Sequence, residues 1–398
     1  MVVGGFGLAV LVGTLLLMLP VAQTGIDWTD PVTALFTATS AVCVTGLVVV
    51  DTGTYWSTFG EVVILALIQV GGLGTMTLAS LLGLAISRKL GLRARVTAAT
   101  ETKAVGLGDV RGVVLGVART SLVVELAVAV VLALRFWAAY DVSPGRAAYL
   151  GVFHSVSAFN NAGFALWPDS LVRFATDPWI CLPIAASVIV GGIGFPVILE
   201  LRKRLRTPRA WSMHTKMTLW ATAVLLVLGT LVNTANEWRN PATLGQLDTP
   251  GRLLAGFFQA VMPRTAGFNS VDTGAMLEGS LLVTVVLMFI GGGSAGTAGG
   301  IKVTTFVLLL LVIWAEVRGE RDVQAFDRRI GERVVRQALT IALLSVTGIT
   351  ADVGTAGHLV LAVLMFVGRL GPITLVSALA LRERQRLYHH PEGRPLIG

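Results

Sequence analysis

The sequence predicts an all-α polytopic membrane protein built from repeated units. Hydrophobic residues make up 54% of its 398 residues, charged residues only 14%, and the mean hydropathy is +0.76. That leaves too little polar surface for a soluble globule of this size. Apolar stretches long enough to cross about 30 Å of hydrocarbon recur along the chain, for example at 60–86 and 281–314. The first stretch, 1–20, lacks a basic segment and a cleavage site, so we expect a retained helix rather than a signal peptide.

Basic residues lie beside the apolar stretches in four clusters and are absent from the loops 23–31 and 51–57. The positive-inside rule places such clusters in the cytoplasm, so they predict four out-and-back units and a cytoplasmic C-terminus. The net charge of +8 is therefore better explained by topology than by a nucleic-acid partner. The clusters lie at 88–95, 202–206, 318–329 and 382–386.

An internal repeat is visible when Gly46, Gly163 and Gly267 are aligned. A phenylalanine stands ten residues before each glycine, and a second glycine element follows 24 to 28 residues after it. The segment between phenylalanine and glycine is too short to cross a membrane, so it must enter and return as a re-entrant helix. The phenylalanines are Phe36, Phe153 and Phe257, and the second elements are 71–74, 191–194 and 291–293, with a fourth copy at 368–371.

Irregular backbone at membrane depth is tolerated only where protein or a water-filled cavity satisfies its polar groups. The glycine turns are therefore expected to meet at one place. The predicted fold is a set of helix–pore loop–helix units in pseudo-fourfold arrangement around one ion pore. Glycine permits the unusual dihedrals with which backbone carbonyls replace the hydration shell of K⁺. A single such glycine would be explained more simply by helix packing, but three in register favour an ion filter.

Five segments together resemble the Trk/Ktr/HKT superfamily of potassium transporters, and most closely its bacterial TrkH/KtrB type. The resemblance implies K⁺ uptake through a multi-pass pore subunit of the cell membrane, with K⁺ as substrate and no cofactor or enzymatic activity. It also implies a homodimer and a cytoplasmic nucleotide-binding regulatory ring of the TrkA/KtrA kind as partner. The segments are 44–47, 160–164, 264–268, 291–302 and 368–372.

The resemblance assigns a backbone-carbonyl selectivity filter to three turns, with K⁺ as the only metal bound. His154 and Asn160, beside the second turn, are interpreted as supporting hydrogen-bond partners and not as ion ligands. The predicted filter residues are Val44, Thr45 and Gly46, then Asn161, Ala162 and Gly163, then Thr265, Ala266 and Gly267.

A glycine-rich break at 291–300 interrupts an apolar run, and glycine costs about 1 kcal/mol per residue in a helix. A phosphate-binding loop is excluded because Ile301 separates Gly300 from Lys302. The resemblance assigns this segment as an intramembrane gate loop. It also implies that Arg369 points into the pore against that loop as an electrostatic barrier, with a structural link to helix-end carbonyls as the alternative. Lys302 is expected either to face the inner vestibule or to snorkel to the interface. The predicted gate residues are Gly291, Gly292, Gly293, Ser294, Gly296, Thr297, Gly299, Gly300, Lys302 and Arg369.

The fourth unit departs from the repeat. The predicted repeats are 1–95, 112–206, 212–316 and an incomplete fourth at 334–386 with an intact return helix. The candidate turn 346–349 fails because Ala338 replaces the expected phenylalanine and Gly368 follows Gly348 after only 20 residues. We therefore expect an internal deletion near Ser345. Two functions stay open: K⁺ transport, or a non-conducting truncated homologue that only assembles with partner subunits. An ATP-dependent membrane enzyme is disfavoured by the missing phosphate-binding loop.

Overall fold

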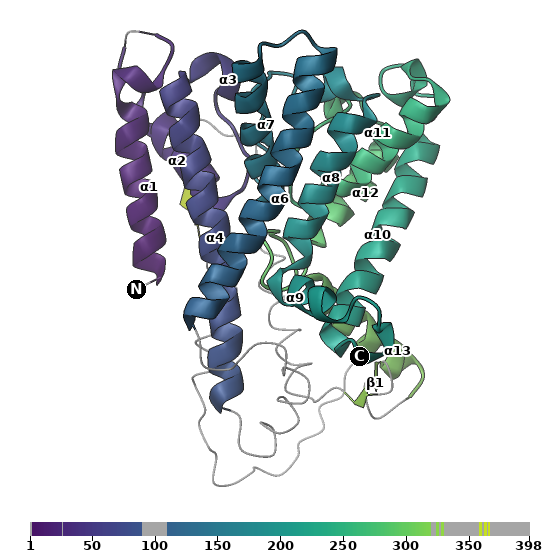
Figure 1. The fold of residues 1–398 in the computed structure, drawn as a ribbon. Coiled ribbons are helices and arrows are strands. Elements are labelled where there is room, and N and C mark those ends of the chain that lie inside the picture. The colour runs from purple at the N-terminus through teal and green to yellow at the C-terminus, as the bar shows by residue number, and fades with distance from the viewer. Residues whose placement is uncertain are drawn as a thin grey trace.

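The computed structural model describes residues 2–25, 27–89 and 110–319, and beyond them only a few short stretches: 324–325, 328–329, 358–359, 362–363 and 365–366. These residues are almost entirely helical (Figure 1), which confirms the all-α class. Two strands of two residues each, β1 (Gln324–Ala325) and β2 (Arg328–Arg329), pair antiparallel. The predicted fourth repeat, with Arg369 and the segments 346–349 and 368–371, lies outside the described residues apart from isolated positions.

The helices follow one another in three groups, each with a short helix near its middle. The first group is α1 (Val2–Met18), α2 (Pro31–Cys43), the single turn α3 (Thr52–Tyr55) and α4 (Thr58–Lys89). The second is α6 (Val110–Ala139), α7 (Pro144–Phe159), α8 (Pro178–Ile193) and α9 (Phe195–Arg204). The third is α10 (Met213–Glu237), α11 (Thr249–Val261), α12 (Glu278–Phe289) and α13 (Val303–Val317). Short 3-10 turns join them: η1 (Pro20–Ala22), η2 (Val172–Phe174), η3 (Pro208–Ala210), η4 (Leu244–Gln246) and η5 (Thr273–Ala275).

The short helices α2, α7 and α11 have 13, 16 and 13 residues, fewer than the roughly 20 needed to cross a bilayer. Each carries proline in its first turn, where the missing N–H is not needed. The carboxylates of Asp30 and Asp248 cap α2 and α11 by accepting backbone N–H groups of the first turn. These helices therefore begin sharply and are too short to cross a bilayer.

The longer helices supply the membrane-spanning elements. Among the described residues, Thr58–Ser80, Arg111–Ala139 and Met213–Glu237 are long and apolar enough to cross a membrane. Helices α8 and α9 would count as one further span but are bent by 100° at Gly194, whose φ is +93°. In Figure 1, α9 turns aside at the lower end of α8. Exposed leucines such as Leu122 and Leu126 on α6 suit contact with lipid. The chain is a multi-pass membrane protein.

Two of the repeated second glycines let a return helix touch the end of a short helix. A Cβ atom on Gly71 of α4 would lie 1.9 Å from the carbonyl oxygen of Val42 in α2. A Cβ atom on Gly191 of α8 would lie 1.9 Å from the carbonyl oxygen of Phe159 in α7. Any side chain at these positions would push the short helix away. The repeated glycines in the sequence therefore reflect the close packing of α2 against α4 and of α7 against α8.

Glu200 joins α9 to the start of α10, and replacing it with alanine should destabilise the protein. Its carboxylate accepts hydrogen bonds from Ser212 N at 2.8 Å, from Ser212 Oγ at 2.6 Å and from Thr215 Oγ1. Hydrogen bonds to a buried charged group each contribute about 1.5–3 kcal/mol, so the loss is about 2 kcal/mol or more. The expected result is a melting temperature several degrees lower in detergent. Glu316→Ala, at an exposed acidic position on α13, is the control and should leave the melting temperature unchanged.

Candidate functional site

The predicted filter turns share one backbone pattern. Each turn follows the C-terminal end of a short helix, and its first and third predicted residues have positive φ angles. Two residues of each triplet are thus left-handed. Glycine adopts this backbone conformation freely, whereas other residues adopt it only under constraint. The φ angles are 54° for Val44 and 76° for Gly46, 58° for Asn161 and 73° for Gly163, and 103° for Thr265 and 83° for Gly267.

The three turns lie in succession, each against the next. A Cβ atom on Gly46 would lie 2.3 Å from the carbonyl oxygen of Ala162, and one on Gly163 would lie 2.0 Å from that of Ala266. A Cβ atom on Gly267 would meet no described atom within 4 Å. The first turn thus contacts the second and the second contacts the third. Within the described residues, the third has no neighbour on its far side.

In each turn, backbone N–H groups are hydrogen-bonded, whereas the carbonyls accept no hydrogen bond from the residues that the structure describes. Thr45 N donates to Ser40 O at 2.9 Å, Ala162 N to Ser157 O at 2.8 Å, and Gly267 N to Met262 O at 3.0 Å. Each bond ties a turn to the end of its own short helix. No hydrogen bond among the described residues ends on a carbonyl oxygen of 44–46, 161–163 or 265–267. The arrangement can therefore offer backbone oxygens to a dehydrated cation.

Side chains behind the second turn hold it in place. His154 is fully buried, with Nδ1 placed 2.8 Å from Leu150 O, and its Nε2 accepts the N–H of Leu166 at 3.3 Å. Asn160 Nδ2 donates to Gln69 Oε1 at 2.8 Å and to Glu125 Oε1 at 3.2 Å. His154 and Asn160 thus make the kind of supporting contacts that the sequence analysis expected.

Glu125 and Gln69 are members of this cluster that sequence reasoning missed. Glu125 is only 6% exposed on α6, and Gln69 Nε2 donates to both of its carboxylate oxygens at 3.1 Å. The signal was available, because Glu125 is an acidic residue within the long apolar stretch Arg111–Ala139. An ionisable residue in such a stretch indicates a specific partner, here the filter-side Asn160.

The predicted gate loop is a closed loop between α12 and α13. Its two ends meet in a parallel bridge between Ile290 and Ile301, with Gly291 N donating to Ile301 O at 3.0 Å. Its tip lies on the end of α8, where Gly293 N donates to Gly192 O at 2.8 Å. A Cβ atom on Gly292 would lie 2.4 Å from the same Gly192 oxygen. The glycines therefore permit a backbone-to-backbone contact that larger residues would prevent.

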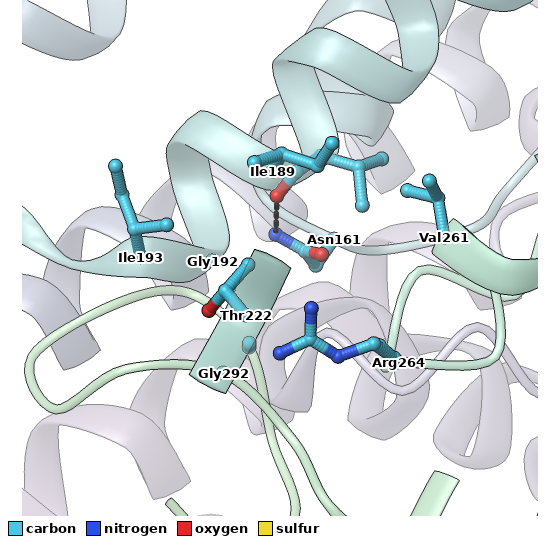
Figure 2. Close-up of a pocket in the computed structure, with 10 residues that line it drawn as sticks. Asn161, Ile189, Gly192, Ile193, Thr222, Val261, Arg264 and Gly292 are labelled. Atoms are coloured by element: carbon cyan, nitrogen blue, oxygen red, sulfur yellow. Dashed lines mark hydrogen bonds between the residues drawn. The ribbon is translucent and has the colours of Figure 1, made fainter. Parts of the chain in front are cut away.

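Two side chains from the filter turns reach this loop. Asn161 Nδ2 donates to Thr297 Oγ1 at 2.7 Å, and that hydroxyl donates onward to Phe159 O at 3.0 Å. Arg264, one residue before the third predicted triplet, donates from Nη2 to Gly291 O at 3.1 Å. Asn161 and Arg264 line one small cavity together with Gly292 of the loop (Figure 2). The loop thus lies directly against the second and third turns.

Other predicted gate residues lie in the loop or directly after it. Lys302 is half-buried, and its Nζ donates to Ala298 O at 2.6 Å across one turn of the loop. Ser294 Oγ lies 3.4 Å from Thr304 Oγ1 at the start of α13. Arg264 was not among the predicted gate residues, although it stands in the motif that the sequence analysis used. Its contact is made with a segment 27 positions away, so sequence alone gives no sign of it.

Comparison with known proteins agrees with this architecture. The family described as "TrkH: Cation transport protein" matches residues 11–349. The chain is 40% identical to "Ktr system potassium uptake protein B" of Bacillus subtilis, over 99% of this chain and 95% of that protein. It is 37% identical to the protein of the same name from Vibrio alginolyticus, over 96% of this chain and 91% of that protein. It is 33% identical to "Potassium/sodium uptake protein NtpJ" of Enterococcus hirae, over 100% of this chain and 96% of that protein.

A solved structure gives the same answer for the fold. The potassium transporter TrkH from Vibrio parahaemolyticus superimposes with a TM-score of 0.68 at 21% sequence identity, covering 95% of this chain and 85% of that one. At that identity the likeness concerns the fold alone. The family match and the near full-length relatives confirm the resemblance found in the sequence. This chain belongs to the TrkH family of cation transport proteins.

Proposed function

We propose that this chain forms the pore of a potassium-uptake system and selects K⁺ with the backbone oxygens of its filter turns. The observation that carries the proposal is the set of carbonyls in the three turns that accept no hydrogen bond within the described part of the chain. Backbone N–H groups of each turn donate to the end of the preceding short helix, which holds the turn in position. Two relatives named potassium uptake proteins, 40% and 37% identical, support K⁺ as the substrate.

Proposed filter chemistry follows from this geometry. A K⁺ ion loses its water when carbonyl oxygens of the turns replace the hydration shell. The short helices α2, α7 and α11 end at the turns, so their C-terminal partial negative charge favours a cation at the centre. The triplets contain no carboxylate. Carbonyl oxygens alone would therefore bind a monovalent ion weakly enough for it to pass on. The proposed filter remains the nine residues predicted from the sequence.

The proposed gate is the loop 291–300. Passage of an ion past the filter requires this loop to move away from α8. Its movement would break the bonds of Gly293 N to Gly192 O and of Thr297 Oγ1 to Asn161 and Phe159. Arg369, outside the described residues, is proposed as a positive barrier beside it. Lys302 is proposed to stabilise the closed loop through Ala298 O.

We further propose the assembly of the working transporter. Relatives named as parts of a Ktr system support association with a cytoplasmic regulatory subunit, here proposed as a nucleotide-binding ring of the KtrA type. The pore subunit is proposed to be a homodimer in the cell membrane with a cytoplasmic C-terminus. Such a ring would act on the gate loop from the side where the basic clusters lie.

One observation supports the second candidate function, that of a non-conducting homologue. The alignment with the Bacillus subtilis relative runs over 430 positions, whereas this chain has 398 residues. That relative therefore has positions with no counterpart here. A missing fourth filter turn would leave one side of the ion's shell open, next to Gly267.

Growth at low K⁺ separates these functions. The chain would be expressed in a bacterial strain without its own K⁺ uptake, together with a KtrA-type subunit and with the Bacillus subtilis relative as positive control. Rescue of growth and uptake of tracer Rb⁺ are expected. Failure of this chain, with rescue after a fourth pore loop is inserted near residue 345, would support the non-conducting alternative. Failure of both versions at normal membrane levels would contradict K⁺ transport.

A further inference from the structure

The geometry points to Arg264 as a latch with two positions that controls the gate loop. In the closed position its guanidinium holds Gly291 O of the loop. In the open position the same group turns into the adjoining cavity and donates to acceptors that have no partner in the closed state. This inference rests on the proposed function of the loop 291–300 as a gate. It adds a positioning residue that lies on the filter side.

The closed position is defined by burial and by a single contact. Arg264 is only 7% exposed, and Nη2 donates to Gly291 O at 3.1 Å. Its buried Nε has no hydrogen-bond partner, and it forms no ion pair within the described part of the chain. A buried guanidinium with one carbonyl partner is costly. The site therefore holds its charge in an incompletely satisfied arrangement, which makes a second arrangement accessible.

The cavity beside Arg264 supplies that second arrangement. Figure 2 shows the guanidinium facing Thr222 and Gly292, with Asn161 above it. Thr222 Oγ1 and Asn161 Oδ1 are buried, and both atoms lack a hydrogen-bond partner among the described residues. Both residues line the cavity together with Arg264. The cavity is thus lined by two oxygen acceptors, Thr222 Oγ1 and Asn161 Oδ1, and by one donor, Arg264 Nε. None of these three atoms has a hydrogen-bond partner among the described residues.

Movement of the loop would exchange one set of partners for the other. When Gly291 leaves, the guanidinium loses the one carbonyl that it contacts among the described residues, and Asn161 loses Thr297 at the same time. Thr222 on α10 and the amide oxygen of Asn161 remain in place to accept the guanidinium N–H groups. A residue with a distinct partner set in each state gives two discrete positions rather than a gradual drift. Removing either set should shift the balance in a predictable direction.

The test measures loop position directly with a cysteine at Ala298. Ala298 lies in the loop and is 2% exposed, so a thiol there should react slowly with a water-soluble maleimide while the loop is closed. Native Cys43 and Cys181 are 2% and 0% exposed and give the background. Arg264→Met should raise the labelling rate of the purified full-length A298C protein roughly tenfold, because a charged hydrogen bond of the closed state is lost. Thr222→Val should lower the rate, because an acceptor of the open state is lost.

Arg252→Met is the matched control. Arg252 lies on helix α11, which precedes the turn that carries Arg264, and its guanidinium donates to Leu247 O at 2.8 Å and Gly245 O at 3.0 Å, away from the loop. Its substitution should leave the labelling rate unchanged. Equal rates in A298C alone and with Arg264→Met would overturn the latch, as would a rate raised by Thr222→Val. If Arg264→Met does not fold, Arg264→Lys replaces it. Lysine keeps the charge without the planar fork, so a smaller increase is expected and an unchanged rate is again contradictory.

Tracer Rb⁺ uptake by the same variants separates this inference from the proposed function. Labelling that follows the prediction, with no uptake by any variant or by the parent, would leave the latch standing and contradict K⁺ conduction. Uptake by the parent, with a labelling rate that does not change when Arg264 is substituted, would support conduction and contradict the latch.

Discussion

Replacing Gly163 with alanine is expected to reduce K⁺ uptake on the order of 100-fold or more. Gly163 has a φ of +73°, and an added Cβ atom would lie 2.0 Å from the carbonyl oxygen of Ala266. That oxygen belongs to the backbone of the next turn, so no flexible side chain can move aside to relieve the contact. A carbonyl displaced by about 1 Å no longer replaces a water of the ion, and positioned sites commonly lose about 100-fold from such a shift.

The chain offers a control that isolates the steric contact. Gly267 has a similar φ of +83°, but a Cβ atom there would meet no described atom within 4 Å. Alanine at Gly267 carries the same backbone strain, of order 1–3 kcal/mol, without the clash. Tracer Rb⁺ uptake, normalised to protein in the membrane, should therefore fall much less for Gly267→Ala. Equal losses would show that strain rather than the contact with Ala266 decides the effect, and normal uptake by Gly163→Ala would contradict the filter assignment.

Much of the fold was predictable because its signals are local. Burial in lipid requires long apolar stretches, and these mark α4, α6 and α10 directly. The positive φ angles at Gly46, Gly163 and Gly267 demand residues that tolerate them, so the turns were visible as glycines in register. The short helices were predictable from the small distance between the repeated phenylalanine and glycine.

What was not predictable depends on contacts between distant segments. The bond of Asn161 to Thr297 joins positions 136 residues apart, and nothing in either segment specifies the other. The bend of 100° at Gly194 divides what the sequence analysis expected as one return helix. Gly194 and the following Pro196 were a signal for that bend, but the same residues are tolerated within continuous membrane helices. The oxygen acceptors beside Arg264 belong to Thr222 on α10 and to Asn161 in the second turn. Only the folded chain brings these segments together.

Replacing Thr297 with valine should raise basal K⁺ uptake roughly tenfold or more. Valine keeps the volume of threonine but removes the hydroxyl that accepts from Asn161 Nδ2 at 2.7 Å and donates to Phe159 O at 3.0 Å. Both partners are buried, Asn161 in the second filter turn and Phe159 just before it, so the closed loop would lose two bonds and leave polar groups poorly satisfied. Each hydrogen bond contributes about 0.5–1.5 kcal/mol, and a sum near 2 kcal/mol shifts a two-state equilibrium by more than tenfold.

The direction of this effect distinguishes a gate from a structural support. If the loop only braced the filter, loosening it would lower uptake or reduce the preference for K⁺ over Na⁺. If the loop blocks the pore, loosening it raises K⁺ uptake while the filter carbonyls stay in place. Thr304→Val is the matched control, because the hydrogen bond of the Thr304 hydroxyl within the described part of the chain is a long contact of 3.4 Å with Ser294 Oγ. Tracer Rb⁺ uptake without the regulatory subunit should therefore rise for Thr297→Val and stay near the parent value for Thr304→Val. A fall in uptake for Thr297→Val would contradict the assignment of the loop as the gate.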